Sequence, residues 1–183
     1  MNRDYALEIL YEYTETESLR KHAYAVESAM RAYAQKFNED EELWGSVGLI
    51  HDFDYEKYPD EHPMKGAEIL EGKGISKDIR MVILGHADFT GIPRDTLMAK
   101  SLFAVDELCG FIVAVTLVRP NKSLGEVSIK SVKKKMKDKR FAAKVNRDEI
   151  RKGAEELGVE FDEHVLFVIH SLIAVATELG LNP

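Results

Sequence analysis

Histidine and carboxylate side chains occur together in this sequence in an arrangement that suits the binding of divalent metal ions. His51 and Asp52 are adjacent at the end of the apolar run SVGLI, and His62 follows ten residues after the aspartate, just before a proline. Imidazole and carboxylate groups suit borderline and hard divalent ions, and a carboxylate can bridge two ions with its two oxygens. Such ions lower the pKa of bound water and neutralise the oxygens of a phosphate ester, so the chemistry expected here is hydrolysis.

Further candidate ligands lie where helical packing favours apolar residues. Asp106 has Leu102 one turn before it and Cys109 one turn after it, so its carboxylate points into the core. Because burying an unpaired charge costs several kcal/mol, such a residue is neutralised, finds a basic partner or binds a metal. The neighbouring Glu107 has a similarly apolar environment, and periodicity alone leaves open which of the two faces a site.

The histidines make the same kind of exception. His22 lies on a stripe with Leu19 and Val26, where a single histidine is more often a hydrogen-bonded core residue than a ligand. It is not alone, however, because four of the six histidines fall near predicted helix ends or on inward faces: His22, His51, His62 and His86. The single cysteine excludes a disulfide framework and a thiolate zinc finger, and it indicates a reducing compartment.

The elements that must position these residues are predicted to be helices throughout. The segment TETESLRKHAYAVESAMRAYAQKF opens with a capping-box pattern, Thr14 followed by Glu17, and then repeats apolar residues with helical period. Glycines supply the breaks between the following segments. Further helices are expected from about Glu41 to Asp52, His62 to Glu71, Lys77 to His86, Leu97 to just before Arg119, and Asp162 to about Leu179. The fold class is therefore predicted to be all-α.

Length and composition fit one domain. A chain of 183 residues with 45% hydrophobic content can bury a sizeable core, and no repeat or long linker demands a second unit. We expect a core of about residues 14–120 and a helical C-terminal extension of about 121–183. The lysine-rich stretch Val132 to Arg140 is either a solvated helix face or a patch that attracts an anionic substrate.

Charge and hydropathy exclude several classes of protein. The formal net charge of −7 argues against general nucleic-acid or bilayer-surface binding, which requires a strongly basic surface. The longest apolar run, Leu108 to Val118, is well short of the roughly 20 residues that a membrane-spanning helix needs. The opening MNRDYALEILYEY has no apolar stretch typical of a signal peptide. A cytoplasmic protein is expected, and its oligomeric state is left open.

The order of these residues resembles the HD superfamily of helical metal-dependent phosphohydrolases. The matching motifs are LRKHAYAVE, GLIHDFD and FAVDEL, and the resemblance covers most of the first 110 residues. The segment HPMKGAEIL is similar to the HPxxGxxIL element of the subset that binds two metals, and VILGHADFTG provides a later histidine. The resemblance implies an HD-domain helical bundle with additional C-terminal helices, holding one or two divalent ions (Mn, Fe, Co, Ni, Mg or Zn).

The resemblance also implies a role for each ligand. One ion would be held by His22, His51, Asp52 and Asp106, and Asp52 would bridge to a second ion held by His62 and His86. Asp52 and His51 are the implied catalytic residues. The implied substrate is a phosphomonoester or phosphodiester, such as a nucleotide or another small phosphorylated metabolite.

Substrate contacts are less well defined by the sequence. Lys100, between one and two turns before Asp106, is either a phosphate contact or a side chain that extends to solvent. The dinuclear cyclic-dinucleotide phosphodiesterases of the superfamily have two adjacent histidines where this chain has His86 and Ala87. They also have a lysine where it has Asp54 and Tyr55. Cleavage of cyclic dinucleotides is therefore not expected.

Two alternatives to a phosphohydrolase remain open. Some HD-fold proteins with four histidines and two aspartates hold a di-iron centre that activates oxygen to cleave a carbon–carbon or carbon–phosphorus bond. The other alternative is a metal-dependent binding or signalling domain with little turnover.

Overall fold

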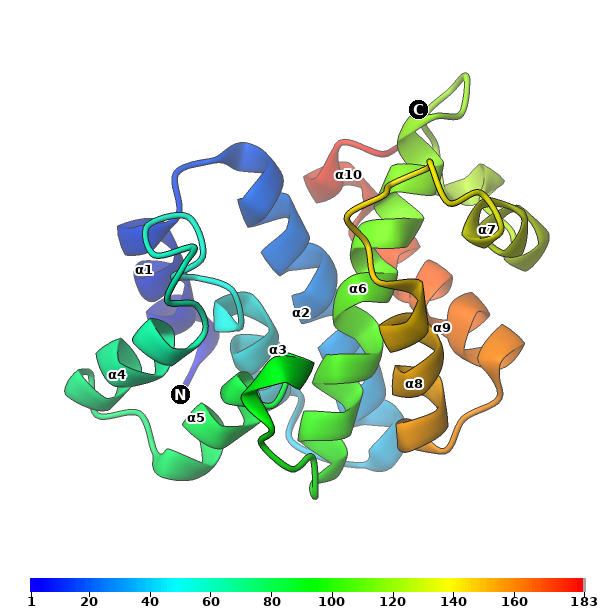
Figure 1. The fold of residues 1–183 in the computed structure, drawn as a ribbon. Helices are drawn as coiled ribbons and strands as arrows, with labels where there is room; N and C mark the ends of the chain where they lie inside the picture. The colour runs from blue at the N-terminus through cyan, green and yellow to red at the C-terminus, as the bar shows by residue number, and fades with distance from the viewer. Residues whose placement is uncertain (183) are drawn as a thin grey trace.

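The computed structural model describes residues 1–182, and within them the chain folds into ten α-helices and two short 3-10 helices, with no strand (Figure 1). The predicted all-α fold is confirmed. The helices are α1 Arg3–Tyr13, α2 Glu17–Phe37, α3 Glu41–Ile50, α4 Met64–Gly72, α5 Lys77–Leu84, α6 Leu97–Leu117, α7 Ile129–Met136, α8 Arg147–Leu157, α9 Phe161–Ala174 and α10 Ala176–Leu179. The 3-10 helices are η1 Asp88–Thr90 and η2 Leu124–Glu126.

The two longest helices, α2 and α6, form the centre of the fold. They pack against each other, α3 lies on α2, α8 lies on α6, and α9 contacts both central helices. In Figure 1 the helices α1 and α3 to α5 lie on one side of this pair and the C-terminal helices α7 to α9 on the other. Because α6 has neighbours on several sides, it is apolar around most of its surface.

Two helix pairs approach unusually closely at glycines. A Cβ atom on Gly153 of α8 would lie 2.6 Å from the Cα atom of Ala104 on α6, and one on Gly48 of α3 would lie 3.0 Å from the Cα atom of Glu27 on α2. The first distance is shorter than real Cβ atoms show, and the second is tighter than most real Cβ contacts. These close approaches hold the end of α3 and the middle of α8 against the helices that carry His22 and Asp106.

One hydrophobic core extends through both parts of the chain. It includes Met30 of α2, Leu108 of α6 and Val168 of α9, all of which are fully buried. Trp44 of α3 is 2% exposed in the same cluster. Within residues 1–182, no helix combines the length and apolar character needed to cross a membrane.

The predicted capping box at the start of α2 was wrong. Thr14 is the residue that ends α1, and its hydroxyl donates to the carbonyl oxygen of Phe53 at 3.0 Å. The helix starts after Thr16, whose hydroxyl donates to Glu56 Oε1 at 2.7 Å. The Glu56 carboxylate also accepts from the backbone N–H of Glu15. A carboxylate from a distant loop therefore takes the place of the local cap.

Several helix boundaries differ from those predicted. The second predicted helix ends at Ile50, the third begins only at Met64, and α5 ends at Leu84, so His51, Asp52, His62 and His86 lie just outside helices. The last predicted helix is divided between α9 and α10. Helices α1 and α8 were not identified from the sequence.

Candidate metal centre

The turn after α3 carries the central residues of the site. His51 is fully buried, and its Nδ1 lies 2.8 Å from the carbonyl oxygen of Gly48. Because a carbonyl oxygen only accepts, Nδ1 carries the proton and the Nε2 atom faces the centre. That Nε2 atom is buried and makes no well-aligned hydrogen bond among residues 1–182, although Asp106 Oδ1 lies 3.3 Å away and Asp52 Oδ2 lies 3.5 Å away. A buried ring nitrogen that faces two carboxylates fits a metal ligand.

The first ligand group combines side chains from α2, the turn after α3, and α6. One ligand atom from each of its four members lies within 4.8 Å of every other: His22, His51, Asp52 and Asp106. Asp106 Oδ1 is 2.9 Å from His22 Nε2 and 3.3 Å from His51 Nε2. Tetrahedral and octahedral metal sites are built from such mixed nitrogen and oxygen donors.

The second ligand group lies on the other side of Asp52. Its members are Asp52, His62 and His86, again with one ligand atom each within 4.8 Å of the others. The Nε2 atoms of His62 and His86 are 3.3 Å apart. The Nδ1 atom of His86 donates to the carbonyl oxygen of Ile83, so both rings present Nε2 to the centre. Two imidazole nitrogens this close to each other are unfavourable unless a proton or a metal ion lies between them.

Asp52 is shared by the two groups, and each of its oxygens faces one of them. Oδ2 is 3.5 Å from His51 Nε2 and 3.9 Å from His22 Nε2. Oδ1 is 3.2 Å from His62 Nε2 and 3.1 Å from His86 Nε2. This is the arrangement of a carboxylate that can bridge two cations.

The electrostatics of the centre favour added positive charge. Burial alone would lower the pKa of His51, but the carboxylates of Asp52 and Asp106 outweigh it and raise the pKa well above the usual histidine value. Burial likewise opposes the charge of Asp52, yet His51 and the other histidines hold its pKa well below the usual range. His62 is desolvated too, but its bonds to Asp52 and Asp54 raise its pKa to about 9. Divalent ions can replace the protons that such a site attracts.

A buried carboxylate that the sequence did not identify supports the second group. Asp54 is fully buried, and its Oδ1 accepts from His62 Nδ1 at 2.8 Å, which directs His62 Nε2 toward Asp52. Its Oδ2 accepts from the backbone N–H of Gly66 at 2.7 Å. Carboxylates in this position fix the orientation of a ligating histidine and raise its basicity. The sequence signal was only a second aspartate in the run DFDY.

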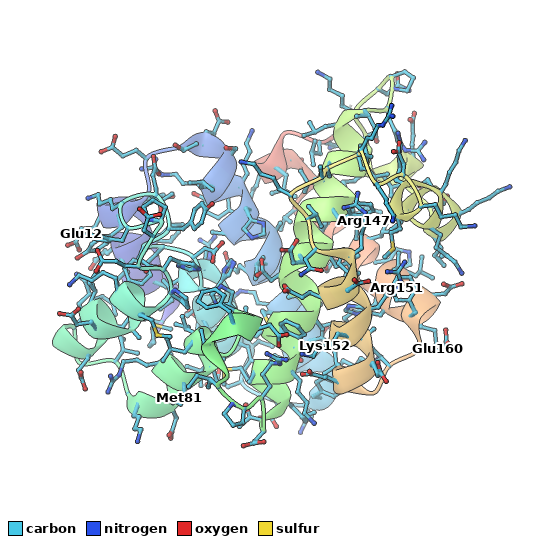
Figure 2. All side chains as sticks on the ribbon, viewed as in Figure 1. Glu12, Met81, Arg147, Arg151, Lys152 and Glu160 are labelled. Carbon is cyan, nitrogen blue, oxygen red and sulfur yellow. The ribbon has the colours of Figure 1, made fainter. Side chains whose placement is uncertain are left out.

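The centre opens onto a cleft of about 590 Å³. All the candidate ligands except the fully buried His51 line this cleft. The segment before α8 and the first turn of that helix contribute Lys144, Asn146 and Glu149. Figure 2 shows Arg147 at the start of α8 beside α6. The Arg147 guanidinium donates to the carbonyl oxygens of Ala142 and Val145 and thereby holds this segment in place. The cleft is within the size range of small-molecule sites.

The structure distinguishes Asp106 from Glu107. Asp106 contacts the histidines, whereas Glu107 Oε2 accepts from the backbone N–H of Asn146 at 3.3 Å and lines the cleft. Burial of Glu107 and the nearby charge of Asp106 raise its pKa to about 7.

All six predicted ligands therefore come together in space, in the two groups expected. Lys100 does not join them, because the cleft lining found within residues 1–182 does not include it. Lys144 does line the cleft, and the sequence analysis missed it because it lies 38 positions after Asp106 in a segment without helical periodicity. Asp88 also lines the cleft, and its carboxylate is paired with Arg94 and Lys152.

Comparisons of the chain with protein-family models, with curated proteins and with solved structures found no match.

Proposed function

We propose that this protein is a metal-dependent phosphohydrolase of the HD type, which hydrolyses a phosphomonoester or phosphodiester. The observation that carries the proposal is the position of Asp52, whose two oxygens face two separate groups of histidine and aspartate ligands. The sequence motifs that resemble the HD superfamily supply these same residues.

The ligand sets follow from the two groups. His22, His51 and Asp106 would hold one ion, His62 and His86 would hold the other, and Asp52 would contribute an oxygen to each. Bound divalent ions would lower the pKa of water and neutralise phosphate oxygens, which is the chemistry that hydrolysis needs. Asp54 keeps His62 oriented, and the Gly48 carbonyl does the same for His51.

The cleft supports a small phosphorylated substrate, and nucleotides are among the candidates. Lys144 is the one Lys or Arg side chain in the cleft lining found within residues 1–182. It is therefore the residue that would contact a phosphate oxygen not bound by the two metal ions. Apart from the histidines, the other charged groups of the lining are carboxylates, including Glu107 and Glu149. A substrate with one phosphate group suits this balance better than a polyphosphate, because only one lysine offsets these carboxylates.

The test is turnover by metal-reconstituted protein under anaerobic conditions. Hydrolysis needs no change in the oxidation state of the metal. We therefore expect manganese, which stays divalent under these conditions, to support the release of phosphate or the cleavage of a phosphodiester. His51→Ala should abolish this turnover. The matched control is His170→Ala, because His170 is exposed on α9 and outside both ligand groups.

Two results would contradict the proposal. Turnover only with iron, with consumption of dissolved oxygen and no hydrolysis of phosphate esters, would make the protein a di-iron oxygenase. Stoichiometric metal binding without turnover of any ester or any oxygen-dependent substrate would favour a binding or signalling domain.

A further inference from the structure

A second groove adjoins the metal centre on the far side of His22. It has a volume of about 430 Å³ and lies between the first turns of α2, the last turns of α6, and the segment from α10 to Leu181. Figure 1 shows these three segments at the same end of the molecule. The groove shares two lining residues with the metal cleft, His22 and Gly110, so the two spaces meet at a metal ligand.

The walls of this groove are apolar. They are formed by Val113, Leu117, Leu179 and Leu181, together with the residues shared with the cleft. Leu117 is 49% exposed although it faces this space. The two charged side chains at the rim, Glu17 and Lys21, form an ion pair with each other at 2.8 Å. The groove therefore offers a ligand apolar contact and little uncompensated charge.

Gly110 occupies the junction of groove and cleft, in the middle of α6. Glycine destabilises a helix interior relative to alanine, so its presence needs a reason. Packing does not supply one, because a Cβ atom on Gly110 would lie 3.9 Å from its nearest neighbours, both in the His22 ring, at ordinary contact distance. What the missing side chain does provide is a wider passage between the metal centre and the apolar groove.

We propose that this groove holds the organic group of the substrate, and that this group is an alkyl or aryl chain attached to the phosphate. The inference rests on the proposed phosphohydrolase function, with the phosphate at the two ligand groups and the chain passing over Gly110. Hydrolysis would transfer the oxygen of water to phosphorus, break the P–O bond to the chain and return a proton to the departing alcohol. Polar sugar phosphates would leave the apolar walls uncovered and are the poorer substrates.

The first test measures binding, which does not require turnover. Ethyl-, butyl-, hexyl- and octylphosphonate would be titrated into the full chain loaded with manganese, and the Kd measured by calorimetry. Because each buried methylene contributes similarly to affinity, the Kd should fall roughly fourfold per added methylene until the groove is filled.

Two variants test whether the alkyl chain of the ligand occupies the groove. Val113→Asn places a polar side chain in the groove one turn from Gly110, and Gly110→Leu narrows the passage; both should flatten the dependence of Kd on chain length. The matched control is Val118→Asn, the same change at a residue that follows α6, is 57% exposed and does not line the groove. Circular dichroism and metal content would show that each variant is folded and loaded.

A second arm measures hydrolysis of the corresponding alkyl phosphates. Chain-length dependence that Val113→Asn removes and Val118→Asn retains supports the proposal. Binding that does not depend on chain length, in a protein that hydrolyses ethyl phosphate, would overturn the groove assignment and leave the hydrolase intact. Chain-length dependence without hydrolysis of any ester would support the groove as the ligand site and refute the hydrolase. A dependence that survives both groove variants would place the chain elsewhere and overturn the inference.

Discussion

Replacement of Gly66 by alanine tests whether Asp54 organises the second ligand group. Gly66 is in the first turn of α4, and its backbone N–H donates to Asp54 Oδ2 at 2.7 Å. A Cβ atom built on Gly66 would lie 2.7 Å from Asp54 Cγ and 2.8 Å from each of its oxygens. The substitution therefore pushes directly on the carboxylate that orients His62.

The expected magnitude follows from this overlap. The added methyl lies about 0.7 Å inside the 3.4 Å at which ordinary contact begins. Asp54 is fully buried and held between Gly66 and His62, so it cannot rotate away without breaking a hydrogen bond. Overpacking of this kind costs about 1–3 kcal/mol, partly offset by about 0.5–1 kcal/mol from the better helix propensity of alanine. Because Asp54 would no longer orient His62, the affinity for the second ion should also fall by about 10–100-fold.

Two measurements check this prediction. Urea denaturation of the metal-free protein gives the change in the free energy of unfolding, and titration of manganese into the folded protein gives the affinity at each group. The matched control is Gly72→Ala in the same helix, where a Cβ atom would have no neighbour within 4 Å. That variant should be as stable as the parent or up to about 1 kcal/mol more stable. If Gly66→Ala matched Gly72→Ala in stability and still bound two ions with the parent affinities, the role assigned to Asp54 would be refuted.

Five other substitutions test the remaining assignments. Asp52→Ala should reduce metal content more than any other single change, because it removes an oxygen from both groups; full metal content by elemental analysis would contradict the bridging role. His62→Ala should lower the metal stoichiometry from about two to about one without loss of helicity by circular dichroism, and a parent stoichiometry of one would favour a mononuclear enzyme. Lys144→Ala should raise KM about tenfold or more for a phosphate ester whereas Lys100→Ala should not, and equal effects would contradict the cleft assignment. Burial lowers the pKa of His164 to about 4. Between pH 6.5 and pH 4 the imidazole is therefore protonated in the unfolded chain and neutral in the folded chain. The contribution of His164 to the free energy of unfolding should therefore be fully present above pH 6.5 and fall by about 3 kcal/mol toward pH 4, and His164→Gln should remove this part of the pH dependence.

The sequence by itself determined the fold class and the residues of the candidate metal centre. Helical periodicity is a local property, so α2 and α6 could be recognised without knowledge of their partners. The candidate ligands were recognisable because they are polar residues at places where packing favours apolar ones, as with His22 and Asp106. Residue type also limits the ions that such a centre could hold, since imidazole and carboxylate select a limited range of metals.

Only the tertiary structure decided which of these side chains contact one another. Asp106 and Glu107 have equally apolar neighbours in sequence, and only the crossing of α2 and α6 brings Asp106 to His22 at 2.9 Å. The boundary of α2 was mispredicted for the same reason, because the carboxylate of Glu56 caps the segment from a distant loop.

The division between the two oxygens of Asp52 was equally inaccessible to sequence. It depends on three turns and on α2, which place histidines on both sides of one carboxylate. Asp54 and Lys144 were missed because neither lies in a periodic segment, and only the folded chain places Asp54 against His62 and Lys144 in the cleft lining. Local sequence thus determines which side chains are available and which segments are helical, whereas the distances between side chains on different elements depend on packing of the whole core.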